Sequence, residues 1–158
     1  MSEKVRGYAH RVDVSADVQR VWRALVEEAS LVRWCSPKAQ IRAESGGVFR
    51  ASVDRVTELE AHIDVFEPKR RMRLIYMSTP ALPPTDSVMV DDFILEPIGK
   101  GESGASGGEP GTILRLLGSG YPATVEWDVP YMRLRTSWQQ AMSRLKVFVE
   151  KQPDRETS

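Results

Sequence analysis

The longest periodic stretch of the chain runs from about Asp128 to Gln152. Its apolar residues recur every three or four positions, which is the spacing of one face of an α-helix. They are Tyr131, Leu134, Trp138, Ala141, Met142, Leu145, Phe148 and Val149. A helix of about 22 residues is roughly 33 Å long. We predict one long amphipathic helix, with Asp128 as its N-cap and a partner of similar length against its apolar face.

Most of the preceding chain alternates between apolar and polar residues, which is typical of half-buried strands. The alternation is cleanest from Leu59 to Val65. Further strands are predicted at 8–14, 40–43, 48–53, 71–77, 87–97 and 112–119, with Ser45-Gly46-Gly47 as a hairpin turn. Two short helices are expected after the first strand, one capped by Ser15 or Asp17 and the other ended by Pro37. This order predicts an α+β fold in which a curved antiparallel sheet of about six to seven strands packs on the long helix.

The composition fits one globular domain over residues 1–158, ordered from about 6 to 151. A Gly- and Ser-rich loop at 99–111 and a C-terminal tail at 153–158 are expected to be flexible. The 158 residues are 41% hydrophobic and carry 22 basic and 22 acidic side chains, so no net charge attracts nucleic acid. No stretch resembles a signal segment or a membrane span, and we expect a cytoplasmic protein.

The order of these elements, with several short motifs, resembles the helix-grip fold of the START/SRPBCC superfamily, which includes the pollen-allergen-like proteins. Within it, the chain looks most like the family named for the activator of heat-shock protein 90 ATPase. The matching segments are 15–25, 31–37, Gly46-Gly47 with Phe49, Phe66-Glu67-Pro68, Leu95-Glu96-Pro97, 111–116, Ser119-Gly120-Tyr121, Trp127 and the final helix. The chain departs from the family pattern at Cys35, at Asp91, where an apolar residue is usual, and at Gly118, where a histidine is common. The last two changes are expected to enlarge or polarise the interior.

The resemblance implies an apolar cavity between the sheet and the long helix, and strand alternation nominates its lining. The nominated ligand-binding residues are Tyr8, His10, Phe49, Ala51, Ile63, Met72, Leu74, Tyr76, Asp91, Phe93, Leu114, Leu116, Tyr131, Leu134 and Trp138. Apolar walls with a few polar groups are typical of small-molecule sites. The alternative is that these side chains simply fill the core.

His10 and Asp91 are the candidates for chemistry, because both fall on inward faces and an unpaired polar group is costly to bury. If they meet, the pair could act in acid–base catalysis or hold the polar end of a ligand. The alternative is a satisfied core histidine and an aspartate that reaches water. Cys35 is expected to be inert, and His62 to be exposed. No metal-ligand spacing, nucleophile elbow or nucleotide-binding motif is present, so neither a metal nor a cofactor is expected.

The favoured hypothesis is a protein that binds a small hydrophobic molecule, such as a lipid, a polyketide or an aromatic metabolite. The alternatives are a cyclase- or dehydratase-type enzyme that uses the same cavity, and a co-chaperone-like interaction module. The sequence leans against catalysis and against a chaperone partner. It leaves open whether the protein is a monomer or a homodimer.

Overall fold

The structure is a computed structural model, and it describes residues 4–98 and 110–151. The predicted tail at 153–158 and nearly all of the predicted loop at 99–111 lie outside the described residues. None of the described helices is both long and apolar enough to cross a membrane.

The described residues form seven strands, three α-helices and one short 3₁₀ turn, in the order that the sequence predicts. In chain order they are β1 (Val5–Val14), α1 (Val18–Val26), α2 (Glu28–Trp34), β2 (Gln40–Ile41), β3 (Val48–Ala51), β4 (Leu59–Glu67), β5 (Arg71–Tyr76), β6 (Val90–Ile98), β7 (Gly111–Pro122), the 3₁₀ turn (Val125–Trp127) and α3 (Asp128–Lys151). The predicted α+β class is therefore confirmed.

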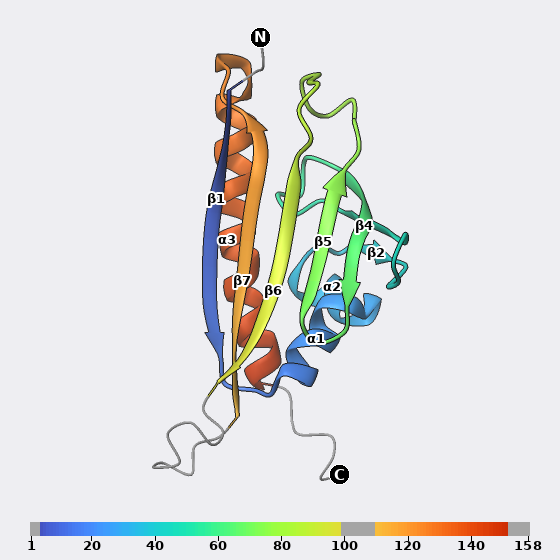
Figure 1. The fold of residues 1–158 in the computed structure, drawn as a ribbon, viewed down its shortest axis with the longest axis vertical. Helices are drawn as coiled ribbons and strands as arrows, with labels where there is room; N and C mark the ends of the chain where they lie inside the picture. Colours follow the sequence, from blue (N-terminus) through green and yellow to red (C-terminus); the bar gives the residue numbers. More distant parts are fainter. Residues whose placement is uncertain (1–3, 99–109, 152–158) are drawn as a thin grey trace.

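All seven strands form one antiparallel sheet in the order β1-β7-β6-β5-β4-β3-β2. The first and last strands pair, so the sheet is not a simple meander. Helix α3 runs along one face of the sheet behind β1 and β7, while α1 and α2 lie near the lower end (Figure 1). The start of α3, the end of β7 and the start of β1 lie together at the opposite, upper end. This is the helix-grip arrangement.

Helix α3 buries the face that its periodicity predicts. Tyr131, Leu134, Trp138 and four further apolar residues of the stripe are buried, and Phe148 packs at the margin of the core. Asp128 is not the N-cap, because its φ and ψ are already helical and a 3₁₀ turn leads into the helix. Its carboxylate instead accepts a hydrogen bond of 2.9 Å from Arg6.

Helix α3 also covers the free edge of β1. The Tyr131 hydroxyl donates to the carbonyl of Gly7, and Lys146 donates to that of Asp13. An edge strand presents unpaired backbone groups that can attract another strand. These side chains occupy part of that edge.

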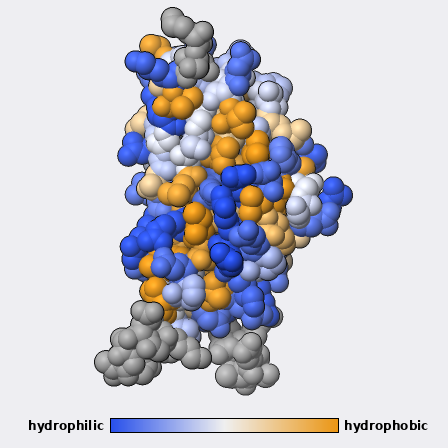
Figure 2. Space-filling view, viewed as in Figure 1, coloured by the Kyte–Doolittle hydropathy of each residue, from blue (hydrophilic) through white to orange (hydrophobic). Residues whose placement is uncertain are grey.

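The sheet face turned away from α3 alternates apolar and charged side chains, which is visible as interleaved orange and blue in Figure 2. The chain has basic residues at positions 69, 70, 71 and 73. Arg71 pairs with Asp92, and Arg73 with Asp64, so two members of this basic run are neutralised by neighbouring strands. The run therefore does not form a free basic patch.

Candidate functional site

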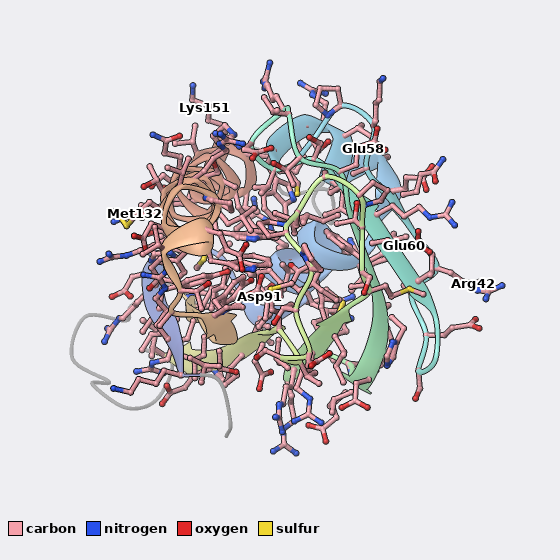
Figure 3. All side chains as sticks on the ribbon, turned by 90° about the horizontal axis from the view of Figure 1, so that it is seen from above. Arg42, Glu58, Glu60, Asp91, Met132 and Lys151 are labelled. Atoms are coloured by element: carbon pink, nitrogen blue, oxygen red, sulfur yellow. The ribbon has the colours of Figure 1, made fainter. Side chains whose placement is uncertain are left out.

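The inner face of the sheet carries rows of side chains that are set by strand register. One row joins Tyr8, Gly118, Asp91, Leu74 and Ile63 across five neighbouring strands. Because side chains of a strand alternate between its faces, the whole row points toward α3. The inward face of Asp91, which the alternation predicted, is thus confirmed. Figure 3 shows Asp91 in the middle of the molecule, between the sheet and α3.

Three tyrosine hydroxyls converge on the carboxylate of Asp91. Tyr8 donates to Oδ1 at 2.6 Å and Tyr76 donates to Oδ2 at 2.6 Å. The Tyr121 hydroxyl lies 3.1 Å from both oxygens. We call these four residues the Asp91–tyrosine cluster. Hydrogen bonds to an ionised acceptor are short and strong, which fits the two distances of 2.6 Å.

The environment of Asp91 pushes its pKa in two directions. Burial raises the pKa of the carboxyl to about 6, while the hydrogen bonds from Tyr76, Tyr8 and Tyr121 act to lower it. Burial, together with the neighbouring carboxylate, also holds the pKa of each tyrosine well above 10. The phenols therefore stay protonated and serve as donors at neutral pH.

Gly118 allows the cluster to form. Tyr8 lies on β1 and Asp91 on β6, and β7 runs between these strands. A Cβ atom at position 118 would lie 2.5 Å from Cζ of Tyr8, so the ring passes directly over the glycine. The expectation that Gly118 enlarges the interior was wrong, because the Tyr8 ring fills the space. The expected polar interior is present at Asp91.

His10 does not pair with Asp91. Its Nε2 atom lies 2.9 Å from the carbonyl oxygen of Arg135 on α3, and its ring stacks on Tyr8 at a centroid distance of 4.9 Å. Since a carbonyl only accepts, Nε2 carries the proton. Burial lowers the pKa of His10, which favours the neutral ring. His10 is thus a satisfied, half-buried histidine that supports Tyr8, the alternative that the sequence left open.

Tyr121 is the member of the cluster that sequence reasoning missed. The strand was predicted to end at Ser119, and strict alternation would place residue 121 opposite to residue 118. In the structure β7 continues to Pro122, and the register shifts between Arg6 and Tyr8. A bulge of this kind changes the phase of alternation, so Tyr121 turns inward. The glycine at 120, which has a φ of +78°, was the signal available in the sequence.

Most of the nominated lining residues pack against one another in this structure. At most 1% of the surface of each of the following is exposed: Phe49, Ile63, Met72, Leu74, Phe93, Leu114, Leu116, Leu134 and Trp138. The Trp138 ring meets Phe93 edge-on at 5.6 Å, and its indole Nε1 has no hydrogen-bond acceptor among the described residues. The apolar interior is therefore closed here, and it contains an unpaired donor.

An open groove of about 580 Å³ lies at the same end of the sheet as the cluster. It is bounded by the segment after α2, the ends of β3 and β4, the loop between them and the start of the β5–β6 loop. Its lining residues are Ser36, Pro37, Lys38, Gln40, Arg50, Ala51, Ser52, Arg55, Val56, Glu58, Leu59, Glu60, Ser78, Thr79 and Pro80. Ala51 alone among them was nominated from the sequence, because the groove brings together loops that are distant in the chain. The first three residues of the proline-containing segment 78–86 form part of the groove wall.

Tyr76 stands between the groove and Asp91. Ala51 pairs with Leu59 at the groove wall, and the next inward row along β4 contains Ala61, which pairs with Tyr76. Successive residues on one face of a strand are about 6.6 Å apart. Tyr76 is half-buried, and its backbone is one row closer to the groove than that of Asp91, although its side chain is not part of the groove lining.

Two further expectations can be compared with the structure. Cys35 is buried at 4% exposure, and burial raises the pKa of its thiol to about 12, which is consistent with the expected inert thiol. His62 is exposed, as predicted. Within residues 4–98 and 110–151, no group of three or more histidine, cysteine, aspartate or glutamate side chains is arranged to hold a metal ion.

Comparison with solved structures shows the same fold in several bacterial proteins. The protein MLL2253 from Mesorhizobium loti has a TM-score of 0.74 at 21% identity, over 94% of this chain and 100% of the other. The Aha1 dimer from Colwellia psychrerythraea has a TM-score of 0.70 at 16% identity, over 92% of this chain and 97% of the other. DynU16, from the dynemicin biosynthetic locus, gives 0.66 at 19% identity, over 92% of this chain and 47% of the other.

No curated protein sequence matches the chain significantly. The model of one family, described as Activator of Hsp90 ATPase homolog 1-like protein, matches residues 15–150. That match begins directly after β1 and continues to the penultimate residue of α3, so it includes every described element except β1. The resemblance drawn from the motifs is confirmed, and the chain belongs to the family of activator of Hsp90 ATPase homolog 1-like proteins.

Proposed function

We propose that this protein binds a small, mainly hydrophobic molecule between the concave face of the sheet and α3, with its polar end at the Asp91–tyrosine cluster. The observation that carries the proposal is the placement of one carboxylate and three phenols at the end of an otherwise apolar interior. Small-molecule sites combine apolar walls with a few convergent polar groups in this way. A lipid, a polyketide or an aromatic metabolite has the required chemistry.

The groove supports the proposal as the place where such a ligand enters. The groove is within the usual volume range of small-molecule sites, about 300–1,000 Å³. The unpaired indole N–H of Trp138 supplies a donor for a ligand oxygen deeper inside. Leaving a buried donor unpaired costs about 1–3 kcal/mol, which a ligand acceptor would relieve.

Native mass spectrometry of freshly purified protein tests the proposal. We expect extra mass that is lost on denaturation, and its value would identify the ligand. A substitution of Ala51, which is 6% exposed in the groove wall, by Leu should reduce the bound fraction. The matched control is Ala9→Leu on an exposed position of β1. Equal ligand retention by both variants would argue against the groove as the path.

The second candidate is a cyclase- or dehydratase-type enzyme that uses the same site. It is favoured by the pKa of Asp91, because a carboxyl with a pKa near 6 can both take and return a proton near neutral pH. His10 is the weaker candidate, since its Nε2 hydrogen is already donated to the Arg135 carbonyl. With a ligand identified by mass, conversion of that ligand by wild-type protein and not by Asp91→Asn would establish this function.

A clean protein mass, with no ligand lost on denaturation, would argue against a retained ligand. The family description then makes a binding assay with the chaperone Hsp90 the next experiment. Binding of the chaperone by ligand-free protein would support the co-chaperone alternative in place of our proposal.

A further inference from the structure

The carboxylate of Asp91 has donors but no cation. Its hydrogen-bond partners among the described residues are the hydroxyls of Tyr8, Tyr76 and Tyr121, which are neutral. Buried charges in proteins are usually paired with an opposite charge, because taking an ion out of water is costly. The cluster therefore lacks one positive charge.

The neighbouring basic groups are engaged elsewhere. Arg6 donates to the carbonyls of Pro122 and Thr124 and to Asp128, and its guanidinium lies over the Tyr131 ring at 4.5 Å. His10 is held by the Arg135 carbonyl, and burial disfavours its charged form. Neither residue neutralises Asp91.

Tyr76 is the partner of Asp91 that a ligand can replace. Tyr8 and Tyr121 are buried at 8% and 1% exposure, and their hydroxyls also lie 3.0 Å from each other. Tyr76 is half-buried, its row in the sheet is next to the Ala51–Leu59 row of the groove wall, and its hydroxyl contacts only Oδ2. A donor that arrives from the groove would meet Oδ2 first once the Tyr76 ring moves aside.

We infer that the ligand of this protein carries a cationic amine, which displaces the Tyr76 hydroxyl and pairs with Oδ2 of Asp91. The inference rests on the proposed function and adds the chemical class of the ligand's polar end. Tyr8 and Tyr121 would remain as donors to the carboxylate and hold it toward the amine. The apolar remainder of the ligand would lie along the interior or the groove.

Three probes of equal chain length test this charge preference: octylamine, 1-octanol and octanoate. Their affinities are measured by calorimetry at pH 7.5 for the wild-type protein, for Asp91→Asn and for Asp92→Asn. Asp92 is the matched control, because it loses the same charge on the opposite face of β6, where it pairs with Arg71. A hydrogen bond to a charged group is worth about tenfold or more in affinity. We expect wild-type protein and Asp92→Asn to bind octylamine about tenfold more tightly than the other two probes.

In Asp91→Asn, octylamine should lose about tenfold in affinity while 1-octanol changes little, because only the amine uses the charge. Tyr76→Phe gives an independent test, since it removes the competing hydroxyl and leaves the ring. This variant should bind octylamine at least as tightly as wild type. Affinity for octylamine should also fall as the pH is lowered from 7.5 to 5, and affinity for 1-octanol should not.

The outcomes separate the two proposals. Equal binding of the three probes, tighter binding of octanoate, or an amine preference that survives in Asp91→Asn would overturn the inference and leave hydrophobic binding intact. Loss of octylamine binding in Tyr76→Phe would also overturn it. If none of the three probes binds wild-type protein, the inference and the proposed function both fail.

Discussion

The ring of Tyr8 lies across the backbone of Gly118, and through this contact a residue of β1 reaches a carboxylate two strands away. A Cβ atom at position 118 would be 2.5 Å from Cζ and 2.6 Å from Cε1 of that ring. Two of the three departures from the family pattern, Gly118 and Asp91, are therefore one structural feature. The glycine provides the space in which the Tyr8 hydroxyl meets Oδ1.

Gly118→Ala should destabilise the protein by about 1–3 kcal/mol, because the added methyl group forces the Tyr8 ring out of place in a packed interior. Equilibrium unfolding in urea measures the change. At Gly111, also on β7, the added Cβ atom would lie 3.1 Å from the flexible side chain of Ile98 and 3.5 Å from the carbonyl oxygen of Val14, so the same substitution should destabilise the protein less. In a Tyr8→Leu background, Gly118→Ala should reduce the free energy of unfolding by less. Additive effects of the two substitutions would contradict the proposed contact.

Asp91→Asn should change how stability depends on pH. The pKa of Asp91 rises from an ordinary 3.8 to about 6 in the folded protein. The folded state thus holds a proton that the unfolded state has released between pH 4 and 6. The contribution of this group to stability is greatest below about pH 4 and is lost as the pH rises to 6, by about 3 kcal/mol.

We therefore expect Asp91→Asn to gain stability relative to wild type as the pH is raised from 4 to 7, measured by urea unfolding at each pH. Asp92→Asn serves as the control for loss of one carboxylate on the same strand. Parallel pH profiles for wild type and Asp91→Asn would show that Asp91 does not titrate in this range.

Two tryptophans offer a matched test of buried hydrogen bonding. Trp34 Nε1 donates to the Ala24 carbonyl at 2.8 Å, in the last turn of α1, where carbonyls lack partners within the helix. Trp138 Nε1 has no acceptor among the described residues. Both side chains are at most 2% exposed, so substitution by Phe removes a similar buried volume.

Trp34→Phe should therefore cost about 1–3 kcal/mol more than Trp138→Phe, because it leaves the Ala24 carbonyl unpaired. Thermal or urea unfolding of the two variants gives the comparison. An equal or larger loss in Trp138→Phe would indicate that the Trp138 indole N–H has a partner in solution, such as a bound molecule.

Cys35 should react slowly with a thiol reagent in the folded protein. Burial raises its pKa to about 12, and only the thiolate is nucleophilic. In the native protein, labelling with a disulfide reagent at pH 8 should be limited by the rate at which the structure opens and exposes the thiol. In denaturant, labelling should be rapid. A Ser119→Cys, Cys35→Ser variant presents an exposed thiol on β7 and should react at once without denaturant. Rapid labelling of native wild type would contradict the burial of Cys35.

The sequence by itself determined the elements and their buried faces. The period of 3.6 from Tyr131 to Val149 and the period of 2 around Leu59–Val65 reflect which side of each element is excluded from water, and this is local information. For the same reason it identified Asp91 as an inward polar residue. The family motifs were likewise sufficient for the fold.

Tertiary structure alone decided what Asp91 meets. Its partners come from β1, β5 and β7, and their distances from Asp91 depend on strand order and on register. They also depend on the bulge that turns the Tyr121 side chain to the inner face of the sheet. None of these is encoded in the spacing of residues within one strand. The partner predicted for Asp91 was His10, but the register places His10 one row along β1, beside Phe93 and Leu116, where the Arg135 carbonyl of α3 satisfies it. The groove has the same origin, because it exists only where three separate segments of the chain converge.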